Sequence, residues 1–354
     1  MKNENFVADL FGDIQEGNML MFDIENRKYM GCKTKLVDWI HPVIYNVAHD
    51  ARTFFDVFAG KGTVGYKALD YYPEVIFNDF LRSNYFMLNA FLANGKLDRA
   101  RVKDFIDVMN NVDGSSLPEN YVSIHFGGKY FGMEAARKIG YIREEIETRK
   151  HEFSEKEYYV LVASLIYSAD RIANIVGHYE AYRKNVKEFK DFEMGMVDAK
   201  CHEGVRVYNM DANVLARKVK CDIAYLDPPY NGRQYCSLYH VPENLAKWKK
   251  PEVHYDTAKP LHMENNSEYS RKHALKVFTD LVLTLDAKYI AVSYNNTYNA
   301  KSDTSNNKMT LEEIRQILEM RGSTMVFDKD YKPFDAGKTE LDNHKEYLFI
   351  TKVK

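Results

Sequence analysis

Residues 53–79, TFFDVFAGKGTVGYKALDYYPEVIFND, decide the fold class. The stretch opens with a short apolar run that predicts a strand, and this strand stops at Gly60. We expect a helix from about Val64 to Leu69 and a second strand over 74–79. A strand, a helix and a strand in this order form a βαβ unit, which indicates an α/β protein with a parallel sheet.

Further strand and helix patterns follow this unit and precede it. A helix is expected over 33–47, kinked or ended by Pro42, and a second over 81–95. Residues 133–190 predict two or three long helices. Further strands are expected at 205–209, 222–226, 289–295, 324–328 and 346–350, and further helices near 242–249, 272–286 and 311–320. The polar stretch 295–308 predicts a mobile loop.

The glycine-rich stretch 60–65, GKGTVG, predicts a ligand site. It matches the pattern G-x-G-x-x-G between a strand and a helix, and Asp79 ends the next strand. Glycines let the backbone approach a ligand closely, and a carboxylate at the end of the second strand suits ribose hydroxyls. The pattern fits nicotinamide dinucleotides and S-adenosylmethionine alike, and a glycine turn that serves only packing is the alternative.

The stretch Asp227-Pro228-Pro229-Tyr230 separates these alternatives. Two prolines end the apolar strand before it and leave a stiff turn at a carboxyl end, where ligands bind in open α/β sheets. Methyl transfer to an exocyclic amine needs acceptors for the N–H protons and a ring that stacks on the base. We expect Asp227 and a proline carbonyl to be the acceptors and Tyr230 to be the stacking ring. A surface turn is the alternative interpretation.

The composition bounds the class of protein. The chain has 354 residues and a formal net charge of −2, so any nucleic-acid binding needs a local basic face. The four cysteines show no Cys-x-x-Cys spacing, which argues against a disulfide framework and a structural metal site. The sequence shows no secretory signal and no apolar run that could span a bilayer, so a cytoplasmic protein is expected.

The order of these motifs resembles that of the Dam-type, alpha-ordered DNA adenine-N6 methyltransferases over most of the chain. YMGCKTKL (29–36) is similar to the N-terminal Tyr/Trp-x-Gly-x-Lys motif, and DVFAGKGTVG (56–65) to the cofactor loop. FND (77–79) resembles the acidic strand end, and YNMDAN (208–213) the strand that brings a further Asp near the adenosine. DPPY (227–230) corresponds to the catalytic motif, in the form that usually goes with adenine.

The resemblance implies S-adenosylmethionine as the cofactor, no metal, and a set of site residues. The implied catalytic residues are Asp227, Pro228, Pro229 and Tyr230. The implied cofactor-binding residues are Tyr29 and Lys33 at the methionine end, Phe58, Ala59, Gly60 and Gly62 in the loop, Asp79 at the ribose, Asp211 at the adenosine, and Asp227 at the junction with the target amine. Lys61 departs from the small residue often found in this loop, and it is expected either to face solvent or to reach DNA.

The resemblance also implies a Rossmann-like, mostly parallel, seven-stranded sheet with one antiparallel edge strand. The catalytic domain is expected in two parts, 1–97 and 201–354, around a mainly helical target-recognition insertion at 98–200. Within 166–184, helical spacing predicts core positions for Ile172 and Ile175. Candidate DNA contacts there, which a solvated helix face also explains, are Arg171, His178, Tyr182, Arg183 and Lys184. The stretch 233–250 is expected to close over a flipped base.

The predicted function is site-specific transfer of a methyl group from S-adenosylmethionine to adenine N6 in duplex DNA by base flipping. The expected partners are double-stranded DNA and a restriction endonuclease that acts on the same site, with no membrane. An RNA or other nucleobase amino-methyltransferase would use the same site and is the first alternative. A DNA-binding module without activity is the second, and the intact lysine, ribose carboxylate and catalytic turn argue against it.

Overall fold

The computed structural model describes residues 14–16, 19–27, 29–254, 256–298, 306–330 and 344–354. They form two compact units, each assembled from separate segments of the chain. The helical unit comprises Met1–Met30, Asn89–His202 and Val241–Pro260. The sheet unit comprises Gly31–Leu88, Glu203–His240 and Leu261–Lys354. The helical unit therefore includes the segments 1–30 and 241–260, which the sequence-based division placed in the catalytic domain.

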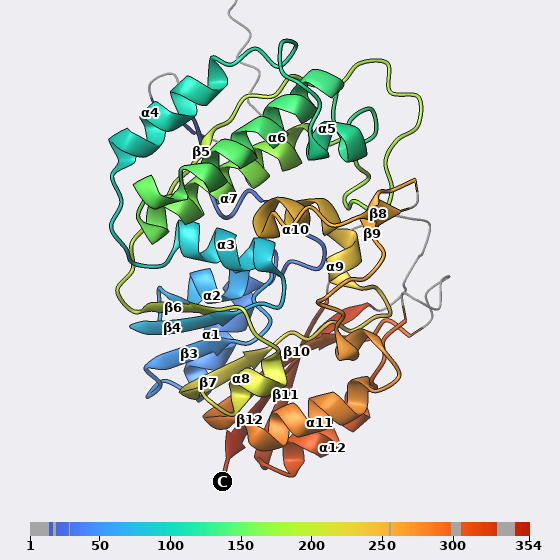
Figure 1. Cartoon of the computed structure of the whole chain (residues 1–354). Helices are drawn as coiled ribbons and strands as arrows, with labels where there is room; N and C mark the ends of the chain where they lie inside the picture. Colours follow the sequence, from blue (N-terminus) through green and yellow to red (C-terminus); the bar gives the residue numbers. More distant parts are fainter. Residues whose placement is uncertain (1–13, 17–18, 28, 255, 299–305, 331–343) are drawn as a thin grey trace, which may run out of the picture. The chain divides into compact units, whose positions relative to one another are not determined.

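The sheet unit contains a sheet of seven strands in the order β11-β12-β10-β7-β3-β4-β6 (Figure 1). Their bounds are β3 Thr53–Asp56, β4 Glu74–Asn78, β6 Val205–Tyr208, β7 Lys220–Leu226, β10 Asp286–Asn295, β11 Gly322–Asp330 and β12 Lys345–Val353. The pairs β10–β7, β7–β3, β3–β4 and β4–β6 are parallel, so the mainly parallel sheet is confirmed. The expected antiparallel edge strand is wrong in position. The reversed strand is β12, which pairs antiparallel with both β10 and β11 and lies second from the edge.

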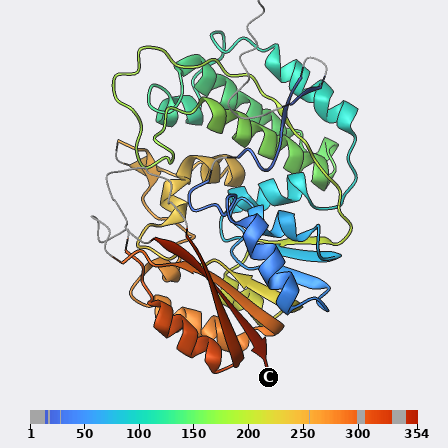
Figure 2. The ribbon, with the colours of Figure 1, turned by 180° about the vertical axis from the view of Figure 1, so that it is seen from behind.

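Helices cover both faces of this sheet. Their bounds are α1 Val37–Val47, α2 Thr63–Ala68, α8 Ala212–Ala216, α9 Tyr235–Leu238, α11 Ala274–Thr284 and α12 Leu311–Glu319, while α3 Arg82–Phe91 begins in this unit. On one face, strand residues such as Phe55 and Ile290 form a buried cluster with α8, α11 and α12, because alternate side chains of a strand share a face. On the other face lies α1, in front in Figure 2, where His41 packs on Phe54. Pro42 lies inside α1 and does not end it.

The helical unit is built mainly from helices. They are α4 Arg99–Asn110, α5 Tyr121–Phe126, α6 Met133–Thr148 and α7 Glu155–Ile172, together with most of α10 His240–Lys247 (Figure 1). Short strands accompany them: β1 Ile14–Glu16, β2 Met19–Phe22, β5 Met196–Val197, β8 Val253–His254 and β9 Lys259–Pro260. A capping box between Ser154 and Glu157 begins α7, whose central residues are buried.

The helical prediction for 133–190 is correct for α6 and α7 and wrong beyond them. No helix follows Ile172 in this stretch, because Ala173 leaves the helical conformation and Gly177 has a φ of +98°. Ile172 and Ile175 are half-buried and not in the core. Residues 299–305 of the polar stretch 295–308 lie outside the described residues, so its predicted mobility stays a prediction.

Candidate active site

Three strands of the sheet unit bring polar side chains to one edge of the sheet. Leu226 at the end of β7 pairs with Val292 of β10, so Asp227 follows beside Ser293. Because β12 is reversed, its amino end lies at this same edge, and Ser293 pairs with Leu348. Glu346 lies two residues before Leu348 and so shares its face of the sheet. The register therefore places Asp227, Ser293 and Glu346 on one face at the carboxyl edge of β7 and β10.

Lys33, in the segment before α1, joins the two carboxylates of this edge. Its Nζ lies 3.1 Å from Asp227 Oδ1 and 2.9 Å from Glu346 Oε1. The side chains of Lys33, Asp227 and Glu346 are only 6%, 17% and 2% exposed. The Ser293 hydroxyl donates a hydrogen bond of 2.6 Å to Glu346. One ammonium group between two carboxylates leaves this buried group with a net negative charge.

Burial and the neighbouring charges together set the protonation of Lys33 and Asp227. Burial disfavours the charged Lys33, but the Asp227 and Glu346 carboxylates outweigh it and hold the pKa of Lys33 well above its ordinary value. Burial raises the pKa of Asp227 to about 6, and the charge of Glu346 adds to this rise while Lys33 opposes it. At neutral pH Asp227 is therefore mainly ionised, although it titrates close to the physiological range.

The glycine turn 60–65 lies between β3 and α2 in the same unit. Gly60 and Gly62 have φ values of +56° and +88°, a conformation that favours glycine. A Cβ at Gly65 would lie 2.2 Å from the Phe77 ring, so close packing accounts for this third glycine. The backbone N–H of Gly65 donates to Asp56 at 2.9 Å. The turn therefore needs its glycines for both conformation and packing.

Two buried ionisable groups, Asp56 and His41, hold the glycine turn by hydrogen bonds. Burial raises the pKa of Asp56 to about 8. The hydrogen bond from Gly65 lowers this pKa, and the charge of the nearby Asp227 raises it. Burial also lowers the pKa of His41 to about 4, so its ring is neutral at pH 7. The His41 Nε2 lies 2.9 Å from the Val64 carbonyl oxygen and joins α1 to the start of α2.

Asp79 follows β4 and holds the turn in place. Its Oδ2 accepts from the Gly60 N–H at 2.8 Å. Its Oδ1 accepts from the Leu81 N–H at 2.8 Å and from Asn84 Nδ2 at 3.0 Å. This carboxylate therefore has a structural role between the turn and α3. Its predicted contact with ribose hydroxyls stays a prediction.

The other predicted cofactor residues have distinct environments. Phe58, Ala59 and Gly60 are half-buried, although they follow the buried strand β3. Asp211 is the N-cap of α8, where it accepts from the N–H groups of Asn213 and Val214, and its side chain stays exposed. The adenosine contact of Asp211 stays a prediction.

Tyr29 and Lys61 differ from the other residues of the predicted cofactor motifs. Tyr29 belongs to the helical unit, where the Arg27 guanidinium lies 5.6 Å from its ring centroid, and its cofactor role stays a prediction. Lys61 is only 5% exposed, so the expectation that it faces solvent is wrong.

The turn after β7 presents the predicted stacking ring. Pro228 is buried, whereas Pro229 and Tyr230 are half-buried. The Tyr230 carbonyl accepts from the Lys308 N–H at 2.8 Å, which ties the turn to the segment before α12. The Tyr230 ring packs edge to face on the Tyr294 ring, with 6.0 Å between the ring centroids. Lys33 Nζ lies 5.7 Å from the centroid of the Tyr230 ring. The ring is thus oriented by neighbours within the sheet unit.

Sequence reasoning missed Glu346, Ser293 and Asp56. Asp56 begins the motif DVFAG at the end of a strand, so its position was a usable signal. Ser293 and Glu346 stand in apolar strand sequences, and a polar residue inside such a run is the signal that they offered.

Several predicted DNA contacts have structural partners in the helical unit. Tyr182 packs edge to face on Tyr130 at 5.5 Å, and Arg171 lies 5.4 Å from the Phe22 ring. Arg183 and Lys184 are exposed. The stretch 233–250 forms α9 and α10, so the helix expected near 242–249 is confirmed, and closure over a flipped base stays a prediction.

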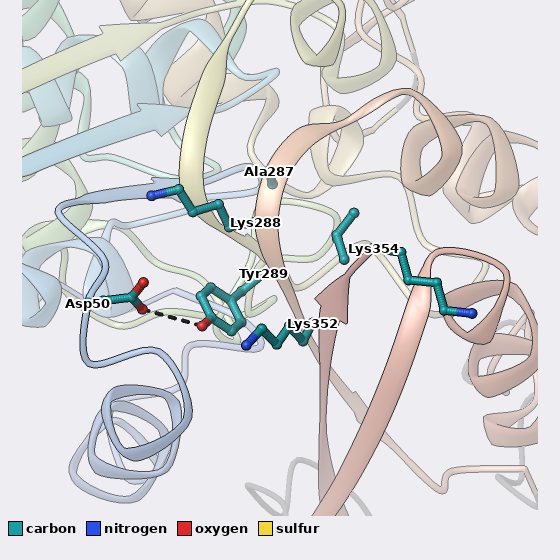
Figure 3. Close-up of a pocket in the computed structure, with 7 residues that line it drawn as sticks. Asp50, Ala287, Lys288, Tyr289, Lys352 and Lys354 are labelled. Atoms are coloured by element: carbon teal, nitrogen blue, oxygen red, sulfur yellow. Dashed lines mark hydrogen bonds between the residues drawn. The ribbon is translucent and has the colours of Figure 1, made fainter.

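A separate depression lies at the opposite edge of the same sheet (Figure 3). It has a volume of about 310 Å³ and is lined by Asp50, Ala287, Lys288, Tyr289, Lys352, Val353 and Lys354. The Tyr289 hydroxyl donates to Asp50 at 3.3 Å, and Lys288 pairs with Asp222 at 2.7 Å. It lies beside the start of β10, whereas Asp227 lies beside its end, so the two sites are distinct.

Two further classes of site are absent from the described part of the chain. No group of three or more His, Cys, Asp or Glu side chains there is arranged to hold a metal ion. Among the helices that the structure describes, none is both long and apolar enough to cross a membrane.

Comparison with known proteins identifies the family. A family model described as D12 class N6 adenine-specific DNA methyltransferase matches residues 29–319. Type II methyltransferase M.NlaIII of Neisseria lactamica is 33% identical over 349 residues, which cover 91% of this chain and 98% of that protein. Type II methyltransferase M.FokI of Planomicrobium okeanokoites is 31% identical over 345 residues, 91% of this chain but 52% of that protein. Type II methyltransferase M.CviAII of Paramecium bursaria Chlorella virus 1 is 29% identical over 339 residues, 92% of this chain and 98% of that protein. The chain therefore belongs to the D12 class of N6 adenine-specific DNA methyltransferases, the family that its motif order resembles.

Proposed function

We propose that the sheet unit binds S-adenosylmethionine at the glycine turn and methylates the N6 amine of an adenine that is rotated out of duplex DNA. The observation that carries this proposal is the buried ion pair of Lys33 and Asp227 at the end of β7. It lies in the same unit as the glycine turn, and the Asp227 charge influences Asp56 beneath that turn. These two observations support one site that contains both the cofactor turn and the catalytic carboxylate.

The residues of this site fit the proposed cofactor. A sulfonium carries a positive charge, and the group of Lys33, Asp227 and Glu346 has a net negative charge. Gly60 and Gly62 leave the backbone of the turn without side chains, so a nucleoside can approach it closely. When bound, the cofactor would supply an electrophilic methyl group.

The side chains of the second turn, Asp227 to Tyr230 after β7, act on the target adenine. Asp227, ionised above about pH 6, accepts from the N6 amine and makes its nitrogen a better nucleophile. The positive charge that develops on the amine is stabilised by the same carboxylate. Tyr230 offers a half-buried ring whose face stacks on the base and fixes its plane.

The helical unit supplies the candidate surface for target recognition, in the insertion that we place at 98–200. The segment 183–190 of this unit carries the exposed cations Arg183, Lys184, Lys187 and Lys190. Phosphate contacts of this kind position a protein on DNA, whereas base contacts select the sequence. Arg143 takes no part in this surface, because it is fully buried and donates to the Leu245 carbonyl at 2.6 Å.

A role in restriction and modification is supported by the names of the relatives. They are type II methyltransferases and modification methylases, some of them matched over about half of their length. We expect a restriction endonuclease with the same recognition sequence as the functional partner. The expected cytoplasmic location follows from the DNA substrate.

The test is to map methylated bases on a plasmid from cells that express this protein but have no other adenine methyltransferase. The expected result is N6-methyladenine at one recurring sequence in the wild type and none with Asp227→Ala. Calorimetric titration of the purified wild type with S-adenosylmethionine and with NADH tests the cofactor independently. Methylation of RNA in place of duplex DNA would support the alternative substrate and refute the one proposed.

A further inference from the structure

Glu346 is a buried acidic residue to which the proposed function assigns a share in the charge of the site but no part in the methyl transfer itself. It is buried and lies at the start of β12, outside the cofactor and catalytic motifs. Its carboxylate accepts from the Ser293 hydroxyl at 2.6 Å and lies 2.9 Å from Lys33 Nζ. A buried carboxylate is costly unless it is paired, so this position calls for an explanation beyond packing.

The charges of the site supply that explanation. Without Glu346, the single ammonium of Lys33 would neutralise Asp227, and the emerging cation on the amine would face a neutral pair. With Glu346, Lys33 is shared between two carboxylates at 2.9 and 3.1 Å, and the group keeps a net negative charge. Fixed charges in a water-excluded site act strongly on charge that develops in a transition state.

The geometry of the sheet holds this arrangement in place. Ser293 lies between Asp227 and Glu346 on the same face, because β10 pairs with β7 on one side and β12 on the other. Its hydroxyl orients the Glu346 carboxylate, and the rigid strands on both sides fix the two acids. Lys33 is therefore held between two carboxylates that the sheet fixes.

We infer that Glu346 is a positioning residue of the methyl transfer, which holds Lys33 so that the group of Lys33, Asp227 and Glu346 keeps a net negative charge toward the reacting amine. This inference rests on the proposed function, because it requires the amine to lie at Asp227. Glu346 acts through Lys33 and is not itself a catalytic residue.

The groups around Asp227 make this role measurable by pH. The titratable groups that influence Asp227 or are influenced by it are Lys33 before α1, Asp56 of β3, Tyr225 of β7, Tyr235 of α9 and Glu346 of β12. The tyrosines are neutral, because burial holds the pKa of both well above the ordinary value. Asp56, whose pKa is about 8, is mainly neutral at pH 7. Among the residues that the structure describes, the charges that act on Asp227 are thus those of Lys33 and Glu346.

The experiment compares Glu346→Gln, Glu346→Asp and the wild type. With Glu346→Gln, we expect kcat at saturating cofactor to fall roughly tenfold, with little change in the KM for DNA. The pKa of Asp227 should fall by about one unit, because a like charge is removed and Lys33 pairs with Asp227 alone. The acid limb of the kcat/KM profile then moves to lower pH, although the variant is slower. Glu346→Asp keeps the charge and should restore most of both properties.

A second readout does not depend on the cofactor. Carbon-13 NMR of the Asp side-chain carboxyl groups follows the titration of Asp227 in the cofactor-free protein, with Asp227→Asn to assign the signal. Thr351→Val is the matched control, since Thr351 is fully buried on the same strand but bonds to Thr324 on β11. It should leave the Asp227 titration and its pH limb unchanged.

The outcomes separate this inference from the proposed function. If Asp227→Ala methylates DNA as well as the wild type, the proposed function is wrong. If Asp227→Ala is inactive but Glu346→Gln keeps the wild-type kcat and Asp227 titration, only the role of Glu346 is refuted. If Glu346→Gln unfolds, Glu346→Asp decides: wild-type titration of Asp227 with restored kcat supports the inference, and loss of activity without unfolding overturns it.

Discussion

Removal of Lys33 should destabilise the protein in a way that depends on pH. Lys33→Met keeps most of the side-chain volume but leaves Asp227 and Glu346 buried without a counter-ion. The two contacts of 3.1 and 2.9 Å and the near-complete burial place this group in the class of buried ion pairs. Breaking such a pair by removing one partner costs about 3–5 kcal/mol in the free energy of unfolding.

The sign of the pH dependence follows from the two carboxylates. Burial already raises the pKa of Asp227 to about 6 in the presence of Lys33, and loss of the cation raises it further. A carboxyl whose pKa is higher in the folded than in the unfolded state binds more protons when folded, so folding is favoured at low pH. The stability of Lys33→Met should therefore approach that of the wild type near pH 5 and fall below it as the pH rises through 6 to 8.

The assay is urea unfolding at pH 5 and pH 8, followed by circular dichroism. Lys67→Met is the matched control, because Lys67 also pairs with a carboxylate at 2.9 Å, Asp70, but both side chains are substantially exposed. An exposed pair contributes little, so the control should differ little from the wild type at either pH. A Lys33→Met penalty below about 1 kcal/mol at pH 8, or one of equal size at both pH values, would refute the reasoning.

Three further predictions concern the reaction and the DNA. The kcat/KM for methylation should decline below about pH 6, because the pKa of Asp227 is about 6 and a protonated carboxyl is a weaker acceptor; a profile flat down to pH 5 would contradict this. Tyr230→Phe should keep most of the activity and Tyr230→Ala should lose about 1–3 kcal/mol of stacking, checked by 2-aminopurine fluorescence at the target base, and equal behaviour of the two variants would argue against stacking. Changing Arg183 and Lys184 together to Gln should reduce the salt dependence of DNA binding without altering cofactor affinity, and an unchanged salt slope would place the phosphate contacts elsewhere.

Local patterns explain which parts of the fold were predictable. The strand, glycine turn, helix and strand over 53–79 were correct, because each boundary is marked by a residue with its own conformational preference, such as Gly62 at the N-cap of α2. The prediction of a helix after Ile172 was wrong, and the reason is non-local. Asn174 donates its N–H to the Tyr130 carbonyl at 2.9 Å and its side chain to the Lys129 and Arg183 carbonyls, so contacts far along the chain replace the helix.

The residues of the candidate site were likewise predictable only in part. Asp227 and Lys33 were found because each stands in a short motif, and the structure joins them directly. The roles of Tyr29, Asp79 and Asp211 toward a cofactor stay predictions, although Asp79 and Asp211 have clear structural roles. A turn carboxylate that caps a helix and one that binds a ribose have the same sequence signature, so sequence alone does not separate these roles.

The reversed strand explains why Glu346 escaped prediction. A strand that follows its neighbours in parallel brings only its carboxyl end to the ligand edge, so residues at its start lie at the opposite edge. Because β12 is antiparallel and inserted between β10 and β11, its first residues reach the ligand edge beside Ser293. An antiparallel strand at the sheet edge, as the resemblance implied, would have placed the same glutamate one strand further from Asp227, at a spacing of about 4.8 Å per strand. The position of one strand in the order therefore decides whether Lys33 has one carboxylate partner or two, and with it the net charge of this buried group.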